Sequence, residues 1–146
     1  MGSRVLEGTP RFAFATDRGR YELWVPAKGL VLERITGHAT GDLVRSMTVD
    51  LDKLLAEASP ISFFDDFEEV ESYESGARQH ITTWTKENWA MVRAVHVLVR
   101  SRAVATAVSV ANVALGGAMR SYTERARFEA AFKLELDQAL APPRKA

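Results

Sequence analysis

The chain has 146 residues, of which 47% are hydrophobic and 26% charged, and its formal net charge at pH 7 is zero. This length and composition are typical of one globular domain and exclude a disordered chain. Nucleic-acid-binding domains normally carry a basic excess, so the zero net charge argues against a nucleic-acid partner. The chain contains no cysteine, which excludes disulfides and thiolate chemistry. We expect a single domain over residues 1–146, with an ordered core at about 11–139 and a flexible tail at 140–146.

The longest apolar stretch, Ala103–Leu115, is too short to span a bilayer. Together with the missing cysteines and the lack of an apolar leader, it predicts a cytoplasmic protein that does not span a membrane. The charges are unevenly distributed, because residues 1–74 hold 8 basic and 14 acidic side chains while residues 75–146 hold 11 and 5. Either the two halves interleave in the fold, or they form opposite poles that would favour a homodimer.

The first part of the chain predicts an antiparallel meander of three strands. Arg11–Thr16 alternates around Phe12 and Phe14, Tyr21–Val25 places its odd-numbered residues on one face, and Leu30–Thr36 is expected to be a third strand. Short turn sequences, Asp17–Arg20 and Pro26–Gly29, separate them. Strands joined by such tight turns pair with their neighbours in sequence.

A helix is expected next, over Gly41–Ala58, with Thr40 as its N-terminal cap. Its apolar residues recur three or four positions apart, which indicates that one face packs on a sheet. Ile61–Phe64 then predicts a buried strand, and the carboxylates that begin at Asp65 predict a solvated acidic loop.

The second half predicts a helix from Ser72 to about Met91, a doubly covered strand at Val95–Val99 and a helix at Ala103–Leu115. The last of these is apolar on nearly all sides, so we expect it to be buried on several sides. A short strand at Ala118–Tyr122 and a helix capped by Thr123 follow. The resulting order βββαβαβαβα predicts an α/β fold with a mixed sheet and about four helices, packed mainly on one face.

Three stretches of the chain, in this order of elements, carry a resemblance to a known fold: Tyr21–Gly37 with the helix Gly41–Ala58, Ile61–Asp66 with Tyr73–Arg78, and His96–Ser101 leading to Gly116 and Gly117. They resemble the STAS fold of anti-sigma-factor antagonists and sulfate-transporter tails. The chain is still more similar to the SpoIIAA-like group of small bacterial proteins, which share a fold type with CRAL-TRIO lipid-transfer domains. The resemblance covers roughly residues 12–136. It implies a bacterial regulatory module that works by protein–protein contact.

The resemblance also implies a modification site. The antagonists carry Asp-Ser-Ser-Gly where their second helix begins, and a partner kinase phosphorylates the serine before the glycine. This chain has Tyr73-Glu74-Ser75-Gly76 at that place, so Ser75 matches, while Tyr73 and Glu74 replace the Asp-Ser pair. The implied partner contact comprises Ser72, Tyr73, Glu74, Ser75 and Arg78. The alternative is an unmodified serine, since serine is common in first helical turns.

Four aromatic residues are candidates for lining an apolar pocket: Phe63, Phe64, Trp84 and Trp89. The lipid-transfer relatives have such a pocket between their sheet and helices. Trp84 is in phase with the buried stripe of its helix, so the alternative for this residue is ordinary core packing. Trp89 is out of phase with that stripe.

No motif of a known catalytic or metal site occurs in the chain. The carboxylates from Asp65 to Glu74 lack the spacing and glycine of a calcium loop, so we expect no metal and no cofactor. His38, His80 and His96 are far apart in sequence, and His96 is expected to be a hydrogen-bonded core residue. The sequence therefore predicts a non-enzymatic protein-interaction module. The alternative is a carrier or sensor of a small apolar or amphipathic ligand; an enzyme would need His80 or His96 in a cleft against a carboxylate.

Overall fold

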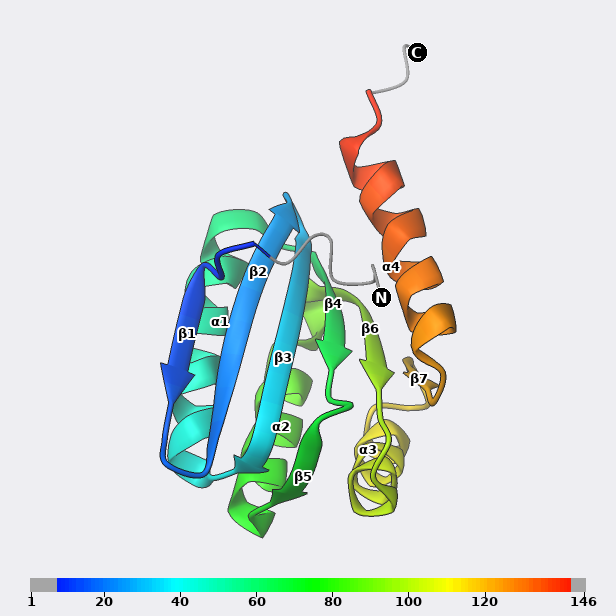
Figure 1. Cartoon of the computed structure of the whole chain (residues 1–146). Helices are drawn as coiled ribbons and strands as arrows, with labels where there is room; N and C mark the ends of the chain where they lie inside the picture. The colour runs from blue at the N-terminus through cyan, green and yellow to red at the C-terminus, as the bar shows by residue number, and fades with distance from the viewer. Residues whose placement is uncertain (1–7, 143–146) are drawn as a thin grey trace.

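The computed structural model of the chain describes residues 8–142, which form a seven-stranded mixed sheet and four α-helices (Figure 1). The strands are β1 (Phe12–Ala15), β2 (Gly19–Ala27), β3 (Leu30–Ala39), β4 (Ile61–Asp66), β5 (Val70–Tyr73), β6 (Val92–Leu98) and β7 (Met119–Tyr122). The helices are α1 (Gly41–Ala58), α2 (Ser75–Glu87), α3 (Arg102–Ala114) and α4 (Arg125–Leu140). Part of the predicted flexible tail, residues 143–146, lies outside the described residues, and Leu140 is the last residue of α4.

The strands lie in the order β1-β2-β3-β4-β6-β7, and β5 pairs with the end of β3 beyond β4. β1, β2 and β3 form the predicted antiparallel meander, while β4, β6 and β7 add in parallel. The strands of the first half of the chain therefore lie on one side of the sheet and β6 and β7 on the other. The strands of the two halves adjoin without interleaving, but α2 packs on α1 and α4 packs on β2 and β3, so the helices of the second half cover elements of the first.

The sheet has a core on each face. Helices α1, α2 and α3 cover one face, and α4 covers the other (Figure 1). Because side chains alternate along a strand, Val95 and Val97 of β6 pack under the three helices, whereas Leu98 packs against Phe128 of α4. The prediction that most helices share one face is confirmed, and α4 is the exception.

The second helix begins later than predicted. Residues Val70–Tyr73 form β5, which pairs in parallel with Gly37–Ala39 at the end of β3. Helix α2 then starts at Ser75, and the side chain of Asn88 ends it by donating a hydrogen bond to the Trp84 carbonyl (2.8 Å). A single 3-10 turn, Trp89–Met91, connects it to β6. The single helix predicted from Ser72 to Met91 is therefore three elements: the end of β5, helix α2 and the 3-10 turn.

The prediction that the third helix is buried on several sides is wrong. In α3 only Val104 and Val108 are buried, while Val110 is 52% and Val113 is 82% exposed. The helix packs on the sheet by one stripe, and within residues 8–142 no other helix covers its outer face (Figure 1). Within the same described residues, none of the helices has both the length and the apolar character needed to cross a membrane.

Candidate functional site

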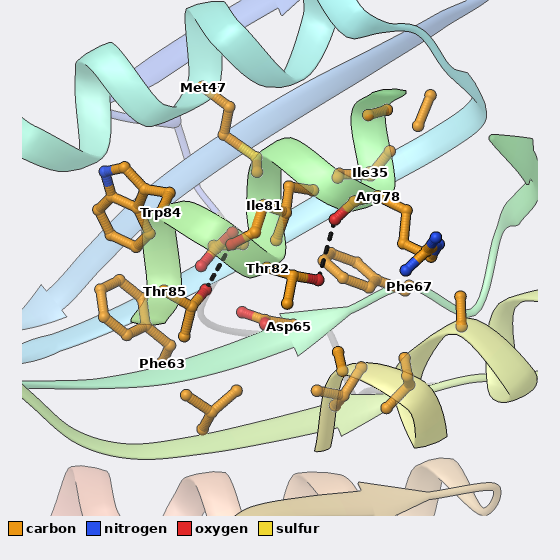
Figure 2. A pocket seen from close by; sticks show the side chains of 18 of the residues that line it. Ile35, Met47, Phe63, Asp65, Phe67, Arg78, Ile81, Thr82, Trp84 and Thr85 are labelled. Carbon is orange, nitrogen blue, oxygen red and sulfur yellow. Dashed lines mark hydrogen bonds between the residues drawn. The ribbon is translucent and has the colours of Figure 1, made fainter. Parts of the chain in front are cut away.

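An apolar cavity of about 120 Å³ lies between the sheet and helices α2 and α3 (Figure 2). Helix α2 packs against α1, where the Trp84 indole donates a hydrogen bond to Asp52 (2.8 Å), whereas α3 packs beside β5. The two helices are held by different neighbours, which leaves space between them above β4 and β6. The apolar side chains that shape this space include Ile35, Phe63, Ile81, Trp84, Val95 and Val108.

Two of the four predicted pocket residues line this cavity. Phe63 and Trp84 meet edge to face, with ring centroids 6.2 Å apart. Phe64 is not in the cavity, because the alternation of β4 turns it to the opposite face, where it stacks on the ring of His96 at 4.2 Å. Trp89 lies in the 3-10 turn and packs at the margin of the core, outside the lining.

Two acidic side chains also line the cavity. Glu33 of β3 and Asp65 of β4 are direct neighbours in the parallel register, and they are only 5% and 9% exposed. Asp65 is therefore a buried strand residue, and its assignment to a solvated loop is wrong. Burial raises the pKa of Asp65 to about 7. Burial and the neighbouring charge of Asp65 raise the pKa of Glu33 well above its ordinary value.

Because the two buried carboxyl groups are neighbours, the state in which both are ionised is unfavourable. When both are ionised, the buried Oδ1 atom of Asp65 has no hydrogen-bond partner among the described residues. The hydroxyls of Thr82 and Thr85 lie nearby but donate to the carbonyls of Arg78 and Ile81 within α2 (Figure 2). They are therefore not donors to the carboxyl pair.

On the other face of the sheet, the next residue of each strand, Arg34 of β3 and Asp66 of β4, belongs to a pair of opposite charges. Arg34 and Asp66 point to the α4 face and form a buried ion pair at 2.9 Å. The Arg125 guanidinium of α4 donates to both oxygens of Asp66 at 2.9 Å and to Glu68 at 2.8 Å. Asp66, which was also expected in a solvated loop, is thus fully paired. Among residues 8–142, no cationic side chain forms such an ion pair with the carboxylates on the cavity face.

The predicted contact edge lies where β5 meets α2, beside the cavity. Ser72, Glu74 and Ser75 are exposed, and Ser75 is the first residue of α2. The carboxylate of Glu74 accepts a hydrogen bond from the Gly41 N–H (2.6 Å). The Ser72 hydroxyl is hydrogen-bonded to Nδ1 of His38 (2.6 Å).

Two members of that edge are also part of the cavity lining. Tyr73 and Arg78 are half-buried and contribute to its wall. The Tyr73 hydroxyl donates to the Ala103 carbonyl of α3 at 3.4 Å. The Arg78 guanidinium points away from Asp65 (Figure 2) and forms no ion pair with either carboxylate among the described residues. The contact edge and the cavity are therefore contiguous.

The histidines lie outside the cavity. His96 is 6% exposed on the α4 face, where its Nδ1 atom is hydrogen-bonded to the Tyr122 hydroxyl at 2.8 Å, and burial lowers its pKa. This matches the prediction of a hydrogen-bonded core histidine. The Nε2 atom of His80 bonds the Thr48 hydroxyl at 2.8 Å. Within residues 8–142, no group of three or more metal-ligating side chains is arranged to hold a metal ion.

No protein-family model and no curated protein sequence matches the chain. Two solved structures are similar to it over 82% of its length. One is an uncharacterized protein of the DUF3478 family with a SpoIIAA-like fold from Shewanella loihica, at a TM-score of 0.63 and 14% identity over 98% of that chain. The other is an anti-sigma factor antagonist from Mycobacterium paratuberculosis, at a TM-score of 0.59 and 13% identity over 97% of that chain. The chain therefore has a STAS-like fold of the SpoIIAA-like kind.

Proposed function

We propose that this protein is a non-enzymatic STAS-like module that carries or senses a small apolar or amphipathic molecule, bound between the sheet and helices α2 and α3. The observation that supports the proposal is the apolar cavity lined by Phe63, Trp84 and the valines of β6. Ligand sites are typically concave and apolar, with a few polar groups that orient the ligand. The Glu33–Asp65 pair would be that polar group.

The size of the cavity limits the ligand. An apolar cavity of roughly 150 Å³ binds benzene, and the cavity here measures about 120 Å³. The buried part of the ligand is thus expected to be one small ring or a short branched chain. A larger molecule would have to displace α3, which is held to the sheet by the buried side chains of Val104 and Val108 and by hydrogen bonds between Asn112 and the Met119 backbone.

Toluene is a suitable first probe, with methyl NMR as the readout. We expect toluene to shift the methyl resonances of Val95, Val97 and Val108. Ala107→Phe places a ring in the cavity wall and should abolish these shifts. Ala114→Phe is the matched control, because Ala114 is exposed on the same helix and outside the cavity lining. Unshifted methyl resonances in the parent protein, or equal shifts in Ala107→Phe, would contradict the proposal.

A second function is supported by the contiguity of the cavity and the β5–α2 edge. We propose that a protein partner binds this edge and that phosphorylation of Ser75 modulates the contact. The exposed Ser75 lies at a helix N-terminus, where a phosphate meets free N–H groups. A ligand that moves Tyr73 or Arg78 would alter the same surface.

The partner proposal is tested with Ser75→Asp, using Ser109→Asp on the exposed side of α3 as its control. Affinity capture with the parent chain and with Ser109→Asp should recover the same protein, and Ser75→Asp should lose it. Recovery of identical proteins by all three chains would count against a contact at this edge.

A further inference from the structure

We propose that the cavity selects primary amines that carry a small apolar group, and that the ammonium binds between the carboxylates of Glu33 and Asp65. This inference rests on the proposed ligand-binding function and names the chemical class of the ligand. The observation behind it is a buried carboxylate oxygen, on Asp65, without a hydrogen-bond donor in the part of the chain that the structure describes. Asp65 is more than nine-tenths buried, lines the cavity, and its Oδ1 atom has no hydrogen-bond partner among the described residues.

An ammonium group matches what the carboxyl pair lacks. It offers three N–H donors, so a single group can bond both carboxylates. The adjacent side chains have no donor to spare, because the hydroxyls of Thr82 and Thr85 are bonded to carbonyls within α2. A ligand hydroxyl offers only one donor and no charge. A ligand carboxylate would add a third negative group and should be rejected.

The charges around the cavity favour a cation. The side chains that line it from α1, α3, β6 and β7 are uncharged. The other titratable groups in the lining are Tyr73 of β5 and Arg78 of α2, and Arg78 points away from Asp65 (Figure 2). The α4 face of the same two strands contrasts with this, because there Asp66 is neutralised by Arg34 and Arg125. A buried carboxylate without a cation is unfavourable, so a ligand cation is the missing partner.

The walls of the cavity exclude a metal ion as that cation. Hard cations take six or more oxygen ligands, whereas the lining around the two carboxylates is apolar: Phe63, Ile81, Trp84 and Val108. An amine needs only the two carboxylates for its polar end, and its apolar group fills the rest. Phenyl and short alkyl groups fit a cavity of about 120 Å³.

Amine binding should depend on pH. A protonated carboxyl group offers the ammonium no negative charge, so Asp65 must ionise before the ammonium can pair with it. Burial raises the pKa of Asp65 to about 7, so Asp65 is largely protonated at pH 5 and largely ionised at pH 8. Benzylamine stays protonated across this range, and its affinity should therefore rise from pH 5 to pH 8.

The test is a calorimetric titration with benzylamine, benzyl alcohol and benzoate at pH 5 and pH 8. At pH 8 we expect benzylamine to bind at least about tenfold more tightly than benzyl alcohol, as expected of hydrogen bonds to charged groups, and benzoate not to bind. Asp65→Asn and Glu33→Gln should each remove most of this preference. Asp137→Asn, an exposed carboxylate on α4, should keep it.

Binding of benzyl alcohol to the Asp65→Asn protein shows that this variant retains its cavity. The amine proposal is overturned if the parent protein binds benzyl alcohol as tightly as benzylamine, or if the preference survives in both Asp65→Asn and Glu33→Gln. If neither benzylamine nor benzyl alcohol binds the parent protein, and toluene shifts none of the cavity methyls, the proposed ligand-binding function fails together with this inference.

Discussion

Replacement of Asp65 by Asn should stabilise the protein at pH 8 and change its stability little at pH 4. The folded state raises the pKa of Asp65 from its ordinary 3.8 to about 7, so it holds the proton more tightly than the unfolded chain does. The stabilisation that comes from this tighter binding of the proton is fully present below pH 3.8 and is lost as the pH rises to about 7. Asparagine has the same shape, carries no charge and can donate to Glu33.

The size of the effect follows from the pKa. Each tenfold change in a dissociation constant corresponds to about 1.4 kcal/mol, so the change from 3.8 to about 7 lowers the free energy of unfolding above pH 7 by on the order of 4 kcal/mol. The asparagine variant escapes most of this loss. A gain of this size is a large part of the total stability of a small domain.

Urea denaturation at pH 4, 6 and 8 provides the measurement. The parent protein is compared with Asp65→Asn and with the exposed control Asp137→Asn. Because the pKa of His96 is lowered from its ordinary 6.5, the contribution of His96 to the free energy of unfolding decreases in the opposite direction, as the pH falls below about 6.5. His96 is present in all three proteins, so its contribution cancels when their free energies of unfolding are compared. A variant that is less stable than the parent at pH 8, or a difference that does not change with pH, would show that the folded state does not raise the pKa of Asp65.

Three further predictions concern the rest of the fold. Asp66→Asn removes the buried negative charge that pairs with both Arg34 and Arg125 and should lower the free energy of unfolding in urea by roughly 3–5 kcal/mol. Gly37→Ala should lower the thermal midpoint measurably, because Gly37 has φ +86° and a Cβ atom would lie 2.6 Å from the Arg18 carbonyl oxygen. Val113→Asp should change the free energy of unfolding in urea by less than about 0.5 kcal/mol, because Val113 is 82% exposed.

Local patterns predicted most of the fold. Thr40 caps α1 as expected, its hydroxyl accepting a hydrogen bond from the Leu43 N–H at 3.1 Å. The alternation in β6 assigned Val95 and Val97 to one face of the sheet and Leu98 to the other. β5 was missed because it is held by parallel pairing with β3, a contact between residues more than thirty positions apart. A four-residue strand of this kind has no local pattern that distinguishes it from a helix start.

The candidate site was missed for a related reason. Asp65 and Asp66 are adjacent in sequence and were interpreted as one acidic loop, yet the alternation of β4 sends them to opposite faces. A local signal did exist, because Glu33 shares its strand face with the buried Val31 and Ile35. Its pairing with Asp65 depends on the register of two strands that are distant in sequence, which no local pattern reveals.

Binding of a small ligand in the cavity between the sheet and helices α2 and α3 is the proposal on which the amine selectivity depends. Intermolecular NOEs between benzylamine and the methyl groups of the parent protein test it most directly. The ring protons should show NOEs to Val95 and Val108, which line the cavity, and none to Val113 on the outer side of α3. NOEs to Val113 alone, or none to any methyl group of the cavity, would contradict the claim.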